Sequence, residues 1–199
     1  HRRKLAFNIL QYDKKVEEGK HQFADFDTAR HRASTLKWRI TENLDKYLIE
    51  FEANFIKRGG KVIWAQDGEE AMTEIIKIMK NANARTVVKS KSMTTEEIHV
   101  NAALEKEGIE SIETDLGEFI VQLRNEHPYH IVTPAMHLSK EDVAKTFHEK
   151  YNLPLKSTPK EITAFVRERL RTKYQNADVG ITGANFLIAD TGGVAVTEN

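Results

Sequence analysis

The chain has 199 residues, of which 40% are hydrophobic and 30% charged. This composition is typical of a folded cytosolic protein and too apolar for a disordered one. The 30 lysines and arginines balance the 30 aspartates and glutamates, so no net charge attracts nucleic acid or anionic lipid, and we expect neither as a partner.

The sequence also limits the cellular location and the cysteine chemistry that we expect. No apolar run approaches the roughly 20 residues of a transmembrane helix, and no signal-peptide pattern follows the basic N-terminus, so we expect a cytoplasmic protein. Cysteine is absent, which excludes disulfides, thiolate catalysis and cysteine-bound metal clusters within these residues. The chain begins at His1 without methionine and stops at Asn199 just after a strand-like segment, so we expect a piece of a longer protein.

The N-terminal part reads as an arm followed by a long helix. Residues 1–27 are basic and poorly periodic, with a possible helix over Leu5–Val16, and we assign no chemistry to them. From Thr28 an apolar residue recurs every three or four positions, which predicts one long amphipathic helix that begins the main domain, residues 28–199. Its apolar face comprises Leu36, Ile40, Leu44, Leu48, Phe51 and Phe55. Gly59 and Gly60 end it.

Short β-rich runs then alternate with helical runs, which is typical of parallel strands joined by crossover helices. The predicted strands are Lys61–Ala65, Thr86–Ser90, Ile109–Glu113, Ile131–Thr133 and Val179–Thr182. The predicted helices span about Glu69–Asn81, Thr95–Glu107, Leu116–Arg124 and Ser139–Lys150, with a last one between Pro159 and Gln175.

The C-terminal end has a different pattern. Two β-rich runs, Phe186–Asp190 and Val194–Thr197, flank a Thr-Gly-Gly turn and predict an antiparallel hairpin. We therefore expect an α/β protein with three layers, α/β/α, around a mainly parallel sheet that becomes mixed at the hairpin.

The first candidate site follows the Thr86–Ser90 strand. Thr94 and Glu97 have the spacing of a capping box, which predicts the start of the next helix. Free amides at a helix start attract anions, and Lys89 and Lys91 would add positive charge. The predicted ligand-binding residues are Lys89, Ser90, Lys91, Ser92 and Thr95. The alternative is a solvated strand end with an ordinary cap.

The second candidate site lies in the glycine-rich C-terminal stretch. Gly180 and Gly183 would let the backbone approach a ligand, and polar residues end the following strand. The predicted ligand-binding residues are Thr182, Gly183, Asn185, Asp190, Thr191 and Gly192. Turn formation alone also explains these residues.

Two further groups carry weaker signals. Asp115 is placed to cap a helix on which Glu118 and Gln122 share one face and would look into one cleft. The histidines His127, His130 and His137 lack a ligand set at metal spacing, so we expect surface histidines and no metal site.

Four segments together resemble one known family. They are Val87–Glu97 (VVKSKSMTTEE), Gly108–Gln122 (GIESIETDLGEFIVQ), His130–His137 (HIVTPAMH) and Gly180–Asn199 (GITGANFLIADTGGVAVTEN). In this order they resemble the N-terminal LUD domain of LutB-type lactate utilisation iron-sulfur proteins, from about residue 28 onward. The resemblance implies a fold similar to the NagB/RpiA/CoA-transferase superfamily, which contains sugar-phosphate isomerases and CoA transferases.

The resemblance also implies a function. It implies oxidation of L-lactate to pyruvate in a complex with other subunits, with electrons passing through [4Fe-4S] clusters. The cysteine-rich ferredoxin region of that family would lie beyond Asn199, so no cofactor is expected within these residues, and this fragment alone is not expected to be active. In the related CoA transferases a Ser-Glu-Asn-Gly turn carries the nucleophile, and Thr197-Glu198-Asn199 resembles it only weakly.

Three functions therefore stay open from the sequence. The first is a subunit of a lactate-oxidising complex whose domain binds a small carboxylate or phosphate. The second is an enzyme similar to a CoA transferase or sugar-phosphate isomerase, with Asp190 or Glu198 as weak catalytic candidates. The third is a non-catalytic domain that docks partner subunits.

Overall fold

The computed structural model describes residues 2–130 and 133–197. Contacts between Cα atoms divide the chain into two compact units. The sheet unit comprises residues 63–183, and the hairpin unit comprises residues 2–62 together with residues 184–197. The predicted boundary between residues 27 and 28 stays a prediction.

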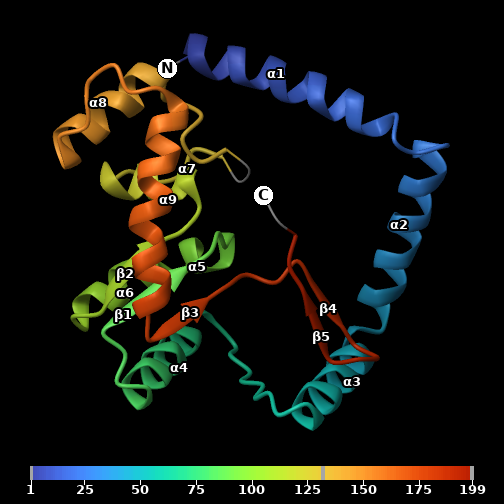
Figure 1. Ribbon diagram of the computed structural model, residues 1–199. Coiled ribbons are helices and arrows are strands. Elements are labelled where there is room, and N and C mark those ends of the chain that lie inside the picture. The colour runs from blue at the N-terminus through green and yellow to red at the C-terminus, as the bar shows by residue number, and fades with distance from the viewer. Residues whose placement is uncertain (1, 131–132, 198–199) are drawn as a thin grey trace. The chain divides into compact units, whose positions relative to one another are not determined.

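A parallel sheet of three strands forms the centre of the sheet unit (Figure 1). Its order is β2 (Glu110–Glu113), β1 (Thr86–Lys89) and β3 (Val179–Ile181). β1 lies in the middle and pairs in parallel with both neighbours, so that Lys89 at its end lies opposite Glu113 on one side. The carboxyl ends of the three strands therefore meet at one edge of the sheet, where α/β proteins commonly bind ligands.

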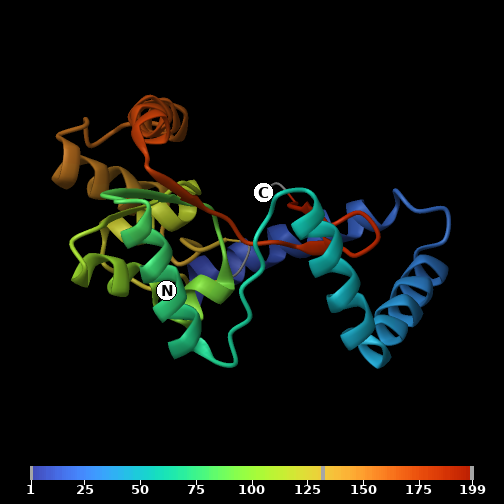
Figure 2. The ribbon, with the colours of Figure 1, turned by 90° about the horizontal axis from the view of Figure 1, so that it is seen from below.

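Different helices cover the two faces of this sheet. They are α4 (Gly68–Asn81), α5 (Met93–Glu97), α6 (Val100–Lys106), α7 (Leu116–Leu123), α8 (Lys140–Tyr151) and α9 (Pro159–Asn176). Because successive strand residues point to opposite faces, Val87 packs with Met79 and Leu104 of α4 and α6, whereas Ile112 packs with the other helices, including Val166 of α9. Figure 2 shows α4 and α9 on opposite sides of the sheet.

Local signals place the helix starts. Asp67, Asp115, Ser139 and Thr158 are the N-caps of α4, α7, α8 and α9, and each side chain accepts a hydrogen bond from an amide of the first turn. These contacts satisfy amides that the helix itself leaves free. Asp115 as a helix cap is thus confirmed.

The hairpin unit combines three helices with two strands. The helices are α1 (Arg2–Lys20), α2 (Phe26–Glu42) and α3 (Leu44–Lys57), and the antiparallel strands are β4 (Phe186–Ile188) and β5 (Gly193–Ala195). Asn54 on α3 donates hydrogen bonds to the carbonyls of Ala189 and Asp190, at 2.9 and 3.2 Å. Gly192 has a φ of +63°, and a Cβ atom there would lie 2.4 Å from the backbone nitrogen of Phe55, so this turn packs directly on α3.

Several predicted elements are confirmed, namely the strands that became β1, β2 and β3, the hairpin, and the helices near α1, α4, α7, α8 and α9. The predicted strand Lys61–Ala65 is wrong, because this segment is irregular and pairs with no described strand. Its Ile63 and Trp64 are about half exposed. A segment with strand preference forms a strand when a neighbouring strand is available to pair and pack with. No described strand pairs with residues 61–65.

Two predicted helices are each divided in the structure. The one predicted from Thr28 to Phe55 breaks at Asn43, whose side chain donates to the carbonyl of Arg39 at 2.9 Å and so competes with the helix backbone. The one predicted over Thr95–Glu107 breaks at His99, which has a φ of +55°, a conformation in which histidine is enriched.

The sheet prediction needs two corrections as well. The hairpin forms its own two-stranded sheet and does not extend the parallel one among the described residues. The predicted strand Ile131–Thr133 lies outside the described residues except for Thr133, which is not in a strand.

Candidate functional site

The carboxyl edge of the parallel sheet holds a buried ion-pair network around Lys89. The Nζ of Lys89 lies 2.7 Å from Oε1 of Glu113, 2.9 Å from Oε1 of Glu96 and 3.0 Å from Oγ1 of Thr95. The side chain of Lys89 is only 1% exposed. Because an ammonium has three N–H donors, these partners engage all of them. Direct binding of an anion by Lys89 would require it to release one partner.

Burial and charge act against each other in this network. Burial lowers the pKa of Lys89, but hydrogen bonds and attraction to Glu113 and then Glu96 outweigh it, and the pKa lies above its usual value. Burial raises the pKa of Glu113, although hydrogen bonds from Asn101 and Lys89 oppose the rise. The second oxygen of Glu113, Oε2, is buried and has no hydrogen-bond partner, so this carboxylate is only partly satisfied.

The side-chain amide groups of Asn101 and Gln122 hold the end of β2 in place. The Nδ2 of Asn101 donates to Glu113 at 2.8 Å, and its Oδ1 accepts from the hydroxyl of Ser111 at 2.8 Å. Gln122 on α7 accepts from the amide of Glu113 at 3.1 Å and donates to the carbonyl of Ser111 at 2.8 Å. Helices α6 and α7 are therefore fixed to β2 by polar contacts.

Glu118 faces the same region from α7. Its side chain is 3% exposed, and its Oε1 has no hydrogen-bond partner. Burial, followed by repulsion from Glu113 and Glu96, raises the pKa of Glu118 to about 7, against a smaller opposing effect of Lys91. This carboxyl group therefore changes its charge near neutral pH.

A pocket of about 320 Å³ lies beside these carboxylates, and we call it the acidic pocket. It is lined by Thr95, Glu96, His99, Val100, Asn101, Ala102, Glu105, Glu113, Glu118, Val121, Gln122, Asn125, Glu126, His127 and Pro128. The expectation that Glu118 and Gln122 look into one cleft is thereby confirmed. The sequence did not indicate Glu96 or Asn101, because neither follows a strand.

Lys91 differs from Lys89 in having no hydrogen bond or ion pair with any described residue. Its Nζ is buried and makes no hydrogen bond with any described residue, and no ion pair joins it to a described carboxylate. Leaving a buried ammonium without a partner costs free energy. A group that accepts hydrogen bonds from Lys91 would remove this cost.

The structure brings together the sheet-unit residues of the predicted site. The hydroxyl of Ser90 donates to Oγ1 of Thr182 at 2.7 Å, which joins the ends of β1 and β3. A Cβ atom on Gly183 would lie 3.1 Å from Ser92 and 3.3 Å from the carbonyl of Lys91. These five residues, Ser90, Lys91, Ser92, Thr182 and Gly183, thus form one cluster at the sheet edge.

The predicted capping box at Thr94 and Glu97 is wrong. Helix α5 begins at Met93 and its N-cap is Ser92, whose hydroxyl accepts from the amide of Thr95 at 3.4 Å. The helix starts earlier because Ser92, two residues before Thr94, has the extended backbone that a cap requires. Since α5 has only five residues, its dipole is too short to support the predicted anion site by itself.

The remaining predicted ligand residues belong to the hairpin unit. Asn185 accepts from the amide of Thr197 at 2.7 Å, while the carbonyls of Asp190 and Thr191 accept from Asn54 and Arg58 of α3. These contacts and the close approach of Gly192 to α3 hold the hairpin turn against that helix. Ligand binding by these residues stays a prediction, and Glu198 lies outside the described residues.

The histidines have differing environments. His137 is 2% exposed, its Nε2 lies 2.7 Å from Oε2 of Glu126, and its ring stacks on Tyr129. The prediction of a surface histidine is therefore wrong at His137, which the hydrogen bond with Glu126 and the stacked ring allow to be buried. His127 and His130 are exposed. No three His, Cys, Asp or Glu side chains of the described residues are arranged to hold a metal ion.

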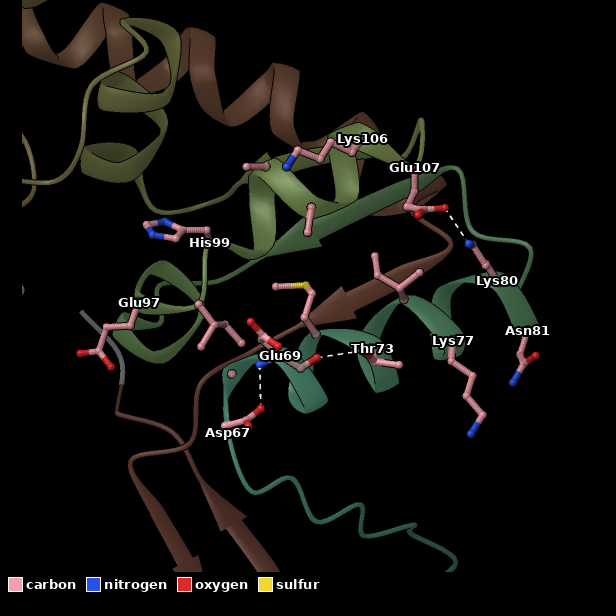
Figure 3. Close-up of a pocket in the computed structure, with 16 residues that line it drawn as sticks. Asp67, Glu69, Thr73, Lys77, Lys80, Asn81, Glu97, His99, Lys106 and Glu107 are labelled. Atoms are coloured by element: carbon pink, nitrogen blue, oxygen red, sulfur yellow. Dashed lines mark hydrogen bonds and ion pairs between the residues drawn. The ribbon is translucent and has the colours of Figure 1, made fainter.

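A second, wider hollow of the sheet unit lies elsewhere (Figure 3). It has a volume of about 1110 Å³ and lies between α4 and the α5–α6 segment. Lys80 and Glu107 form an ion pair of 2.7 Å, and Asp67 caps α4 within it. Its charged side chains are exposed, and none is buried without a partner, so it carries weaker functional signs than the sheet edge.

Comparisons with known proteins identify the family. The family model of the LUD domain matches residues 48–199. Lactate utilization protein B of Lysinibacillus sphaericus is 45% identical over 179 residues, which cover 89% of this chain and 38% of that protein. The proteins of the same name from Oceanobacillus iheyensis and Bacillus subtilis strain 168 are 43% and 42% identical, over 89% and 92% of this chain and 37% and 38% of their own lengths.

The sheet edge with its charged residues is thus that of a LUD domain, and the chain belongs to the LUD domain family. It spans about 38% of the length of the curated relatives it matches. The comparison with solved structures found no match. Within the described residues, no helix is long and apolar enough to cross a membrane.

Proposed function

We propose that this chain is the LUD-domain part of a longer protein that works in lactate utilisation, and that it binds a small carboxylate or phosphate beside Lys91. The family match and the names of the relatives support the pathway. The observation that carries the binding proposal is the buried Nζ of Lys91, which has no partner among the described residues.

An anion suits this position for physical reasons. Buried ammonium groups in proteins are normally paired, because an unpaired one has lost its water without replacement. A carboxylate or phosphate would accept charge-assisted hydrogen bonds from Lys91. The hydroxyls of Ser90 and Thr182 lie at the same sheet edge, where Ser90 donates to Thr182 and Thr182 donates to the carbonyl of Gly183, so a ligand there would have to take the place of one of these acceptors to gain a second donor.

Lys89 has a different part in this proposal. Its three donors are engaged by Thr95, Glu96 and Glu113, so we assign it to holding the sheet edge together and not to contact with the ligand. The hairpin residues Asn185, Asp190, Thr191 and Gly192 stay predicted ligand residues.

The activity of the whole protein is carried over from the resemblance. We infer that the longer protein takes part in oxidising L-lactate to pyruvate in the cytoplasm, together with other subunits. Its [4Fe-4S] clusters would be bound by residues beyond Asn199, since this chain has no cysteine. The NagB/RpiA/CoA-transferase-like fold and its three layers belong to the same proposal.

A docking role is the second candidate, and one observation favours it. Strands β4 and β5 carry large apolar side chains that are exposed, namely Phe186 at 61%, Leu187 at 50%, Ile188 at 42% and Val194 at 45%. Exposed apolar clusters often mark contacts with other protein segments. The transferase or isomerase alternative would depend on Asp190 or Glu198 and has less support.

Calorimetric titration of the chain with L-lactate, pyruvate and inorganic phosphate tests the binding proposal. We expect at least one of these anions to bind, and Lys91→Met to weaken that binding roughly tenfold or more, because a hydrogen bond to a charged group contributes about 1.5–3 kcal/mol. Lys77→Met is the matched control, since it removes the same charge from an exposed position, and its effect should stay below about twofold.

Two results would overturn this proposal. One is the absence of binding of all three anions to the unmodified chain at millimolar concentrations. The other is equal loss of affinity in Lys91→Met and Lys77→Met, which would indicate a general effect of charge and no site at Lys91.

A further inference from the structure

The acidic pocket has no part in the anion site proposed above, yet it combines features of a ligand site. Two of its carboxylates are almost completely buried, with Glu113 2% and Glu118 3% exposed. Each has one oxygen that lacks a hydrogen-bond partner, Oε2 of Glu113 and Oε1 of Glu118. Buried polar atoms in folded proteins are nearly always paired, so two such atoms beside one pocket require a partner.

The donors beside the two buried carboxylates are already engaged. The amide nitrogens of Asn101 and Gln122 already donate to Glu113 and to the carbonyl of Ser111. Lys89 makes three contacts and has no further donor. A ligand that satisfies both carboxylates must therefore bring hydrogen-bond donors of its own.

The charge of the pocket indicates a cation. Glu96, Glu105, Glu113, Glu118 and Glu126 line it, and no lysine or arginine does. Lys89 compensates the charges of Glu96 and Glu113 from one side, while Arg124 forms an ion pair with Glu126. Glu118 has no ion pair with any described residue. A bound positive charge would offset repulsion among the three inner carboxylates.

We propose that the acidic pocket binds a small organic cation with N–H donors, such as a primary ammonium group, between Glu113 and Glu118. The pocket volume of about 320 Å³ lies at the lower end of the range for small-molecule sites. An organic cation is favoured over a metal ion, because no three ligating side chains of the described residues are arranged for one.

The test is an NMR titration of the ¹⁵N-labelled chain with ethylammonium at constant ionic strength. The amides of Glu113 and Glu118 and the side-chain amide of Gln122 report on the pocket. We expect saturable shifts of these signals with ethylammonium. Ethanol, which is neutral, and tetramethylammonium, which is charged but has no N–H donor, should cause no saturable shift.

Variants connect the response to the buried carboxylate. Glu118→Gln should weaken ethylammonium binding roughly tenfold or more, because it removes a charged acceptor with little change of shape. Glu105→Gln is the matched control, since Glu105 lines the same pocket but is exposed, and it should weaken binding by less than about threefold. Glu118→Gln is preferred to a change at Glu113, whose loss would also disturb Lys89.

The outcomes separate this proposal from the anion site. Lys91→Met should leave ethylammonium binding intact even where it abolishes anion binding. The proposal is overturned if ethylammonium causes no saturable shift, if ethanol or tetramethylammonium act equally, or if Glu118→Gln and Glu105→Gln respond alike.

Discussion

Lys89 and Glu113 end adjacent parallel strands, lie opposite each other in the register, and form an ion pair of 2.7 Å although both are almost completely buried. Their pairing explains how a charged residue can end each of two strands whose last three residues are buried. The polar strand ends bind to each other, and they also hold α5 and α6 in place at the sheet edge.

Removing one partner of this pair should be strongly destabilising. Lys89→Met leaves Glu113 and Glu96 without their buried cation, so we expect a loss of about 3–5 kcal/mol in the free energy of unfolding. Urea denaturation measures it, with Lys77→Met as the exposed control. The double variant Lys89→Met with Glu113→Gln should lose less than the sum of the single changes; additive losses would show that the pair is not coupled.

Glu118 should make stability depend on pH. In the folded chain its pKa is about 7, whereas its usual value is 4.5, so the folded state binds the proton more tightly. Its contribution to the free energy of unfolding is therefore highest at acid pH and falls as pH rises from about 4.5 to about 7.

Glu118→Gln removes this fall. Between pH 4.5 and pH 8, the free energy of unfolding of the variant should rise by about 1–3 kcal/mol relative to that of the unmodified chain. Urea denaturation at several pH values measures this difference. A difference between the two proteins that stays constant over this range would contradict the raised pKa.

Gly192 should be intolerant of a side chain. Gly192→Ala places a Cβ atom 2.4 Å from the nitrogen of Phe55 at a φ of +63°, so the turn must move away from α3, and we expect a loss of about 2–3 kcal/mol. Gly19→Ala is the control, because nothing lies within 4 Å of that position on α1. Thermal unfolding compares them, and similar melting temperatures would show that the turn does not pack as described.

Much of the fold was readable from local patterns. The helical runs of α4, α7, α8 and α9 predict these helices, and in the structure each has a polar cap just before its first turn. The runs around Val87 and Ile112 predict buried strands because β-branched residues fill them. The failures at Lys61–Ala65, Asn43 and His99 depend on tertiary neighbours and on single backbone conformations, which periodicity does not record.

The site was predictable in position but not in its contacts. The sequence places Lys89 and Lys91 at a strand end, and the structure confirms that both lie at the sheet edge. It gave no sign that Lys89 would be enclosed by Glu96 and Glu113 while Lys91 pairs with no described residue, because that difference depends on how α5 packs over the strand. The burial of Glu118 likewise follows from packing of α7.

A crystal structure of this chain with L-lactate or phosphate tests the proposed anion site at Lys91 most directly. We expect the carboxylate or phosphate oxygens to lie within hydrogen-bond distance of Nζ of Lys91, near Ser90 and Thr182. An anion bound elsewhere, or a Lys91 ammonium paired with a carboxylate of the protein itself, would contradict the account.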